Sequence, residues 1–330
     1  MTNDGSRPVL VYGATGHTGQ AVVGALTERG LVAVLAGRDP DRLGALAGEL
    51  GVESRAFGVD AVPDLAGVGL VVNCAGPFAD TALPLARAAL AAGAHYVDIA
   101  AEQPSTLALL HSWAGRAERA GVVVMPGVGF FGALGDLVLT SLVGQADDGA
   151  PWDRVDVEVE LAGWHPTDGT LATGDRNPGD RLRLHEGLLV TTPATTAPGR
   201  VELRLSEHLL VPRHLPVRTL QTTVNASAIE DLEAARDLTP DERLRAREAG
   251  DPYSVRVIAR RGDEERTAEV AGEDFYAVTG PLVAEVALAL LSGGLPPGAR
   301  APGELPDPAG LLGRLPLSRV KPSATFGPVP

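Results

Sequence analysis

The sequence PVLVYGATGHTG, residues 8–19, decides the fold of the first part of the chain. Its opening apolar run ends at a glycine, as buried strands of parallel sheets do, and a helical pattern follows over residues 18–29. In such a strand–turn–helix unit Gly13 allows the tight turn, Gly16 lets the backbone approach a pyrophosphate, and Gly19 lets the helix pack closely on the strand.

The helix after this turn would point its unpaired N–H groups and its positive dipole end at the phosphates of a dinucleotide. The spacing is G-x-x-G-x-x-G, a variant of the stricter G-x-G-x-x-G fingerprint, and a glycine-rich turn without a ligand is the alternative interpretation. We predict dinucleotide binding by the following residues of the turn: Gly13, Thr15, Gly16, His17, Thr18 and Gly19.

Short apolar runs and helical patterns continue to alternate up to residue 125. Strands separated by helices of 10–15 residues predict right-handed crossovers and a parallel sheet covered on both faces, so the fold class is α/β, a Rossmann-type doubly wound sheet. Strands are expected over residues 31–36, 54–57, 69–73, 96–99 and 122–125, and helices over residues 41–50, 81–92 and 105–119.

After residue 126 the pattern changes to alternation with period two, which is typical of strands with one wet face. We expect such strands over residues 155–161, 201–205, 217–224, 255–259 and 267–270. The prediction is a second α+β domain on a mostly antiparallel sheet, residues 128–276. The dinucleotide domain comprises residues 1–127, with a C-terminal segment of about residues 277–330 packing back. That segment begins with an apolar helix over residues 279–291 and is expected to be extended from residue 293.

The second predicted strand indicates which dinucleotide binds. Where an NAD site would place an acid for the ribose hydroxyls, this chain has Arg38, and a guanidinium can bind the 2′-phosphate of NADP. Asp39 would repel that phosphate if it pointed inward. Asp60 could hydrogen-bond the adenine edge, or be an ordinary loop aspartate. We therefore predict NADP(H), with a solvated strand-end charge as the alternative interpretation of Arg38.

Composition excludes several other functions. The 330 residues carry a formal charge of −14, which disfavours binding to nucleic acid or to an anionic membrane. All basic residues are arginine except Lys321, so neither a GxxxxGK[ST] loop nor a Tyr-x-x-x-Lys proton relay is possible. Cys74 is the single cysteine, and the seven histidines show no metal-ligand spacing, so we predict no metal. No basic and apolar leader opens the sequence, which reads as cytoplasmic.

Further motifs follow in order along the chain: NCAGPF at residues 73–78, YVDIAAE at 96–102, GVGF at 127–130, GDL at 135–137 and GEDFYAVTG at 272–280. With GATGHTG they resemble the saccharopine dehydrogenase-like reductases, including the bacterial branch of trans-acting enoyl reductases. The resemblance covers most of the chain and is strongest over residues 8–137 and 250–292. The chain departs from the family pattern at Ala101, usually glycine, and over residues 164–196.

The resemblance implies a Rossmann domain, a second domain that supplies the substrate pocket, hydride transfer from NAD(P)H, and a homodimer formed through the second domain's sheet. It also implies that Ala75, Gly76, Pro77 and Phe78 lie beside the dinucleotide. Two further residues, Gly129 and Phe130, would lie near its nicotinamide end.

Reduction also requires a proton, and three residues are candidates to supply it. His165 titrates near neutrality when unperturbed and follows a predicted strand, although a surface-loop histidine is the alternative. Glu102 stands at a strand tip, where burial could raise its pKa; capping the next helix or bonding backbone N–H groups is its alternative role. Tyr253 is a weaker candidate.

The sequence thus predicts an NADPH-dependent oxidoreductase that transfers a hydride to a C=N, C=O or C=C bond of a small metabolite. A non-enzymatic NADP(H) sensor of the NmrA-like type would keep the glycine turn without catalysis, and it remains the alternative.

Overall fold

The computed structural model describes residues 7–144, 149–176, 182–191, 196–248 and 250–325. The chain forms two compact units, residues 1–129 with 279–300 and residues 130–278 with 301–330. Residues 301–325 therefore group with the second unit, and not, as predicted, with the first.

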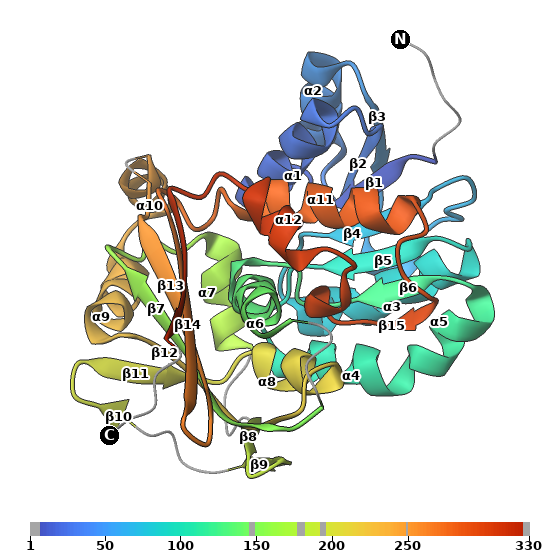
Figure 1. The fold of residues 1–330 in the computed structure, drawn as a ribbon. Helices are drawn as coiled ribbons and strands as arrows, with labels where there is room; N and C mark the ends of the chain where they lie inside the picture. Colours follow the sequence, from blue (N-terminus) through green and yellow to red (C-terminus); the bar gives the residue numbers. More distant parts are fainter. Residues whose placement is uncertain (1–6, 145–148, 177–181, 192–195, 249, 326–330) are drawn as a thin grey trace. The chain divides into compact units, whose positions relative to one another are not determined.

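The first unit contains a seven-stranded sheet of order β15-β6-β5-β4-β1-β2-β3 (Figure 1). Every strand pair in it is parallel, which confirms the predicted doubly wound α/β fold. Its elements are β1 (Val9–Tyr12), α1 (His17–Glu28), β2 (Ala33–Gly37), α2 (Pro40–Leu50), β3 (Glu53–Ala56), η1 (Val59–Ala61), β4 (Leu70–Asn73), α3 (Phe78–Ala91), β5 (His95–Asp98), α4 (Gln103–Ser112), α5 (Ala114–Ala120), β6 (Val123–Met125), α11 (Thr279–Leu291) and β15 (Gly298–Ala299).

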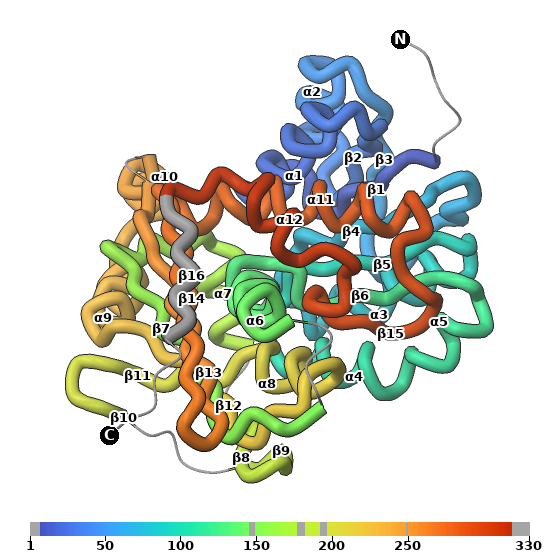
Figure 2. Tube along the Cα trace, viewed as in Figure 1, coloured from blue at the N-terminus to red at the C-terminus, as the bar shows by residue number. Residues whose placement is uncertain are grey.

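The buried strands of this sheet divide their side chains between two helical layers. Leu10 and Val71 face a core that includes Leu85 and Ala89 of α3. On the other face α1 packs against α11, and Figure 2 shows how this late segment of the chain runs beside the early helix. The approach is close, because a Cβ atom on Gly280 would lie 2.6 Å from the carbonyl oxygen of Ala21.

Two predictions for this unit need correction. The single helix expected over residues 105–119 is two helices, because Trp113 interrupts it with φ −112° and ψ −12° and is buried in the core. Residues 293–300 do not simply extend over the surface, since β15 pairs in parallel with β6 and adds an edge strand to the sheet.

The second unit contains a mixed sheet of order β10-β11-β12-β7-β13-β14-β16 and a small hairpin of β8 and β9. Only β7 and β12 pair in parallel among the strands described, so the sheet is mostly antiparallel, as predicted. Its elements are η2 (Phe130–Leu134), α6 (Gly135–Val143), β7 (Trp152–Leu161), α7 (Asp168–Asp175), β8 (Leu182–His185), β9 (Leu188–Thr191), β10 (Thr196–Ala197), β11 (Arg200–Leu203), α8 (Glu207–Leu210), η3 (Val211–Arg213), β12 (Val217–Asn225), α9 (Ala226–Ala234), η4 (Ala235–Asp237), α10 (Pro240–Arg247), β13 (Tyr253–Arg261), β14 (Glu264–Gly272), η5 (Pro302–Glu304), α12 (Pro308–Gly313) and β16 (Arg319–Thr325).

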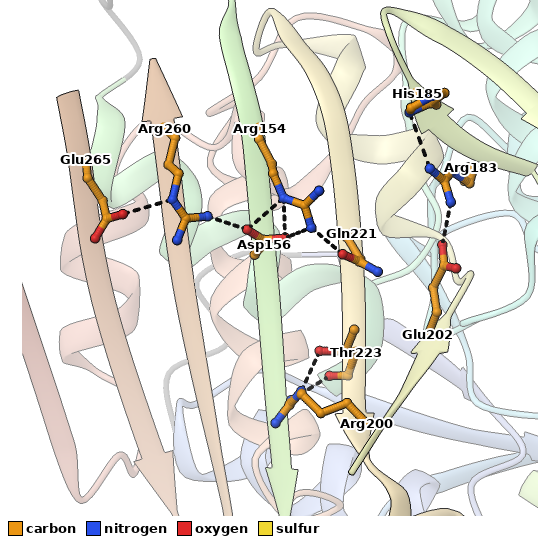
Figure 3. Close-up of polar contacts among 10 residues, drawn as sticks. All are labelled: Arg154, Asp156, Arg183, His185, Arg200, Glu202, Gln221, Thr223, Arg260 and Glu265. Carbon is orange, nitrogen blue, oxygen red and sulfur yellow. Dashed lines mark hydrogen bonds and ion pairs between the residues drawn. The ribbon is translucent and has the colours of Figure 1, made fainter. Parts of the chain in front are cut away.

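One face of this sheet is apolar and packs on α6, where a Cβ atom on Gly135 would lie 3.1 Å from Val157. The other face carries charged side chains that pair across neighbouring strands (Figure 3). Arg260 of β13 contacts Asp156 of β7 at 2.5 Å and Glu265 of β14 at 2.9 Å. The alternation read from the sequence therefore separates a core face from a polar face.

The C-terminal segment joins the second unit through backbone contacts. β16 pairs antiparallel with β14, and the N–H of Gly303 donates to Asp136 Oδ2 of α6 at 2.8 Å. Leu305 and Leu311 are buried and residues 301–313 contain η5 and α12, so this stretch is not the extended surface segment expected from its prolines. Among the described residues, no helix has the length and apolar character needed to cross a membrane.

Candidate functional site

The glycine turn of the first unit is held tightly against the sheet. Gly13 has φ +83°, and the N–H groups of Gly13 and Ala14 both donate to the carbonyl of Ala36, at 2.8 and 3.2 Å. A Cβ atom at position 19 would overlap the carbonyl oxygen of Gly13 and lie 2.9 Å from Ala14 Cα. Only glycine at position 19 permits this approach of α1 to the turn, as expected from the motif.

The N terminus of α1 is suited to an anion. Its cap residue is Gly16, no side chain caps the helix, and its first turn contains no acidic residue. Thr15 and Thr18 are half-buried, whereas Gly16 and His17 are exposed at the turn. The backbone N–H groups and dipole of α1 therefore favour a phosphate here, and the backbone at positions 13, 16 and 19 fits a dinucleotide.

Two charged side chains, Arg38 and Asp39, follow the end of β2. Asp39 caps α2, because its Oδ1 accepts from the N–H groups of Asp41 at 3.1 Å and Arg42 at 3.0 Å. Its carboxylate is therefore held at its own helix. Arg38 is exposed and makes no hydrogen bond or ion pair with the described residues, so its guanidinium is available to a ligand.

Tyr12 connects this region to the predicted adenine side. Its hydroxyl donates to the carbonyl of Phe57 at 3.3 Å, and the two rings pack with centroids 5.3 Å apart. Burial raises the pKa of Tyr12, the charge of Arg38 opposes that rise, and Asp60 adds to it. Arg38 and Asp60 are thus both electrostatic neighbours of the Tyr12 hydroxyl.

Arg42 is a residue that the sequence reasoning missed. It lies in the first turn of α2, and its Nη2 donates to the carbonyl of Thr15 in the glycine turn at 3.1 Å. A second guanidinium therefore lies at the turn. The sequence feature that could have identified Arg42 is its position in the first turn of the helix that begins just after Arg38.

A buried hydrogen-bond network shapes the carboxyl ends of β4 and β5. The amide of Asn73 donates to Thr81 Oγ1 at 3.0 Å and to the Tyr96 hydroxyl at 3.2 Å, and its Oδ1 accepts from the N–H of Ala75 at 3.0 Å. Tyr96 in turn donates to Asp98 Oδ2 at 3.0 Å. The network fixes the start of the segment that the resemblance places beside the dinucleotide.

Within that segment Ala75, Gly76 and Pro77 are half-buried, and a cis peptide joins Gly76 to Pro77. Phe78 differs, because its side chain is only 7% exposed and packs in the core of the unit. Its ring is therefore a core side chain of α3. Contact of these residues with a cofactor stays a prediction.

Two carboxyl groups lie beside this network. Burial raises the pKa of Asp98 to about 6, against hydrogen bonds from the N–H groups of Gly127 and Ala100. Burial also raises the pKa of Glu102 to about 7, and its Oε1 accepts from the N–H of Phe78 at 3.2 Å. Glu102 makes no side-chain cap on α4, so of its two alternative roles the structure favours the bonding of backbone N–H groups over the capping of the next helix.

In the second unit His165 pairs with Asp251. His165 Nδ1 lies 2.5 Å from Asp251 Oδ1, and the backbone N–H of His165 donates to Asp251 Oδ2 at 3.4 Å. The Asp251 side chain is 2% exposed and that of His165 is 34% exposed. Burial raises the pKa of Asp251, while the hydrogen bond and charge of His165 oppose that rise.

A cluster of aromatic rings in the second unit includes residues next to this pair in the sequence. Its members, in contact at centroid distances of 4.2–6.3 Å, are Phe130, Phe131, Trp164, Tyr253, Phe275 and Tyr276. Trp164 precedes His165, and Tyr253 follows Asp251 by two residues. The second unit therefore brings the predicted residues Phe130 and Tyr253 into ring contact, and His165 follows directly after Trp164 of the same cluster.

Tyr253 is buried, with its hydroxyl packed against the backbone of Gly272, where a Cβ atom would lie 2.6 Å from the oxygen. Burial, followed by the charge of Asp274, raises the pKa of Tyr253, so its phenol stays protonated. Among the described residues the hydroxyl has no hydrogen-bond partner.

The remaining predicted residues lie in separate units. Glu102 and the buried Gly129 are in the first unit, and Phe130 begins the second. In the part of the chain that the structure describes, no three His, Cys, Asp or Glu side chains gather as a metal site would require. The absence of a metal stays a prediction.

Comparisons with known proteins agree with a dinucleotide-binding first unit and with the fold of the chain. Residues 9–125 match the family model described as the saccharopine dehydrogenase NADP binding domain. The fold is similar to that of apo saccharopine dehydrogenase (L-Glu forming) from Saccharomyces cerevisiae, with a TM-score of 0.62 and 15% identity, over 96% of this chain and 100% of that chain. A probable dehydrogenase from Thermotoga maritima is also similar, with a TM-score of 0.51 and 13% identity, over 90% and 92% of the two chains. Curated protein sequences gave no match.

The family model and the fold point to the same conclusion. The matched residues begin at β1 and end at β6, so they span the glycine turn, Arg38 and the network around Asn73. A nicotinamide dinucleotide is the ligand that this domain type binds. Residues 9–125 are therefore a domain of the saccharopine dehydrogenase NADP-binding type, and the fold of the whole chain is similar to that of saccharopine dehydrogenase.

Proposed function

We propose that the protein is an NADPH-dependent reductase that transfers a hydride to a C=N, C=O or C=C bond of a small metabolite. The observation that carries the cofactor choice is the end of β2. Arg38 is exposed and unpaired among the described residues, while Asp39 is held by the N-terminal N–H groups of α2. A 2′-phosphate would meet a guanidinium there and no opposing carboxylate.

The hydride comes from the reduced nicotinamide when NADPH is bound. This chain's own residues bind the diphosphate through the turn at residues 13–19 and supply one proton. We propose His165 as the donor of that proton, because its ring is partly exposed and is held by a buried carboxylate. Tyr253 also keeps a protonated hydroxyl, but that hydroxyl is buried against Gly272, which makes the partly exposed His165 the better candidate.

The substrate side of the proposal rests on the second unit's composition. The rings of the aromatic cluster favour an apolar group next to the reacting bond. The nearby cations are engaged within the protein, since Arg243 pairs with Asp168 at 2.5 Å and Arg247 Nη1 donates to the carbonyl of Pro166 at 2.6 Å.

Cofactor binding is tested by calorimetry with NADPH and NADH. Loss of one charge-assisted hydrogen bond weakens binding by about 1.5–3 kcal/mol, so Arg38→Ala should weaken NADPH binding about 10- to 100-fold and leave NADH unchanged. Arg87→Ala is the matched control, because Arg87 is also exposed, lies on α3, and has no ion pair among the described residues. Equal affinities for the two nucleotides in the unmodified protein would refute the assignment of NADPH.

Catalysis is tested by following NADPH oxidation with imines, ketones and conjugated esters. Turnover with one of these classes, lost in His165→Gln, supports the reductase. NADPH binding without any turnover would instead favour the NADP(H)-sensing alternative.

The predicted homodimer and cytoplasmic location belong to this proposal as well. The dimer rests on the resemblance to the family. Light scattering at micromolar concentration should then give twice the mass of the chain, and cell fractionation should recover the protein with cytoplasmic markers.

A further inference from the structure

We propose that Asp251 is a positioning residue that holds His165 with its proton on Nδ1, so that Nε2 is the atom that gives the proton to the substrate. The inference rests on the proposed reductase function and deepens it. Nothing in the residue types near position 165 signals this partner, because 86 residues separate the two side chains.

The carboxylate contacts His165 twice. Asp251 Oδ1 lies 2.5 Å from Nδ1 of the ring, and Oδ2 accepts from the backbone N–H of the same residue at 3.4 Å. An ionised carboxylate only accepts hydrogen bonds, so Nδ1 must carry the hydrogen. Nε2 makes no hydrogen bond with any described residue. The two contacts together fix both the tautomer and the orientation of the ring.

Both partners are held by their own surroundings. The N–H of Phe275 donates to the carbonyl of Asp251 at 3.2 Å, and the N–H of Ala162 donates to the carbonyl of Pro252 at 2.9 Å. Next to His165, the indole N–H of Trp164 donates to the Tyr276 hydroxyl at 3.3 Å. The pair is therefore built on anchored backbone, as a site with fixed geometry requires.

His165 is the neighbour of Asp251 that can carry a positive charge. Asp251 is 2% exposed, and its electrostatic neighbours are His165, Asp274 and Tyr276. Tyr276 is neutral because burial raises its pKa, and Asp274 has the same sign as Asp251. The imidazolium of His165 is thus the one group in this set that can neutralise the buried carboxylate.

Hydride addition to carbon moves the π electron pair of C=N or C=O onto the heteroatom, and for a conjugated C=C onto the electron-accepting group. That electron pair takes the proton from Nε2, so imidazolium becomes neutral imidazole with Nδ1–H still bonded to Asp251. Since the His165 side chain is 34% exposed, solvent can return the proton to Nε2.

The first test measures the tautomer directly and needs no substrate. Long-range ¹H–¹⁵N spectra of histidine-labelled protein, with His165→Gln to assign the signal, should show neutral His165 protonated on Nδ1. In Asp251→Asn the amide N–H can face Nδ1 instead, so that preference should be lost. Asp274→Asn is the matched control, because Asp274 Oδ1 bonds the N–H groups of Tyr276 and Ala277 and not His165. An unchanged tautomer in Asp251→Asn would overturn the proposal.

The second test is kinetic. Asp251→Asn should lower kcat about 100-fold, in the range of general acid catalysis, and leave KM within about threefold, because the group acts on proton transfer. The double variant Asp251→Asn/His165→Gln should be no slower than His165→Gln alone. Circular dichroism must show that the variants are folded. Additive losses in the double variant, or full activity of either single variant, would overturn proton delivery through this pair.

The two proposals fail in different ways. If the unmodified protein reduces no substrate, the reductase function fails while the spectra still decide whether Asp251 sets the tautomer. If turnover occurs but Asp251→Asn leaves the tautomer and kcat unchanged, the reductase function stands and the role of Asp251 is refuted.

Discussion

Replacing Gly19 by alanine would place a Cβ atom inside the contact distance of the turn that precedes α1. That atom would overlap the carbonyl oxygen of Gly13 and lie 2.9 Å from Ala14 Cα, both of them backbone atoms that no rotamer change can move. Overpacking of this kind costs about 1–3 kcal/mol, and the better helix propensity of alanine returns about 1 kcal/mol. We therefore expect a net loss of up to about 2 kcal/mol and a shift of the N terminus of α1 away from Gly13.

Thermal unfolding and NADPH titration measure the two effects. Gly24→Ala is the matched control on the same helix, because a Cβ atom there meets nothing within 4 Å. Gly24→Ala should raise stability by about 0.5–1 kcal/mol and keep NADPH affinity. Gly19→Ala should lower the melting temperature and weaken NADPH binding at least about 10-fold. If the two variants behave alike in both assays, the close packing of α1 on the glycine turn does not determine the geometry of the dinucleotide site.

Three further predictions concern Arg42, Glu102 and the ion pair of His214 with Asp136. Arg42→Ala should weaken NADPH binding, measured by calorimetry, because its guanidinium lies at the glycine turn. The pKa of Glu102 is raised to about 7 in the folded state, so its ionisation makes native stability fall as pH rises above about 4.5. Glu102→Gln removes this cost. In urea unfolding it should stabilise the protein by up to about 3 kcal/mol at pH 8 and by nearly nothing at pH 4. Burial lowers the pKa of His214, but the charge and hydrogen bond of Asp136, at 2.7 Å, outweigh it and leave the pKa raised. The stability from this pair is complete below the unfolded pKa and is lost as pH rises through the folded pKa, and Asp136→Asn should abolish that pH dependence of urea unfolding.

Local patterns explain what the sequence could predict. The glycine turn, the β1 strand and helix α11 are each specified by neighbours in sequence, and α11 spans the residues 279–291 expected from its apolar pattern. The Asn73 segment also follows from adjacent residues, because the strand tip and the turn after it are consecutive. The family resemblance rests on motifs of this kind.

Contacts between distant segments explain what the sequence could not predict. Asp251 is 86 residues from His165, and only the pairing of β7 with β13 brings the two strand ends together. The break at Trp113 depends on its burial in a core that several helices build. The placement of residues 301–325 depends on β14, a partner strand that periodicity cannot identify.

The return of α11 to the side of α1 also determines when the first unit can be completed during synthesis. The ribosome makes α1 early, but Gly280, which touches the backbone of Ala21, emerges only after the whole second unit up to residue 278. At about 5–20 residues per second this delay is on the order of 10–50 s. During that time the nascent cofactor domain carries an uncovered apolar helix face, which makes it a client for chaperones until the last part of the chain arrives.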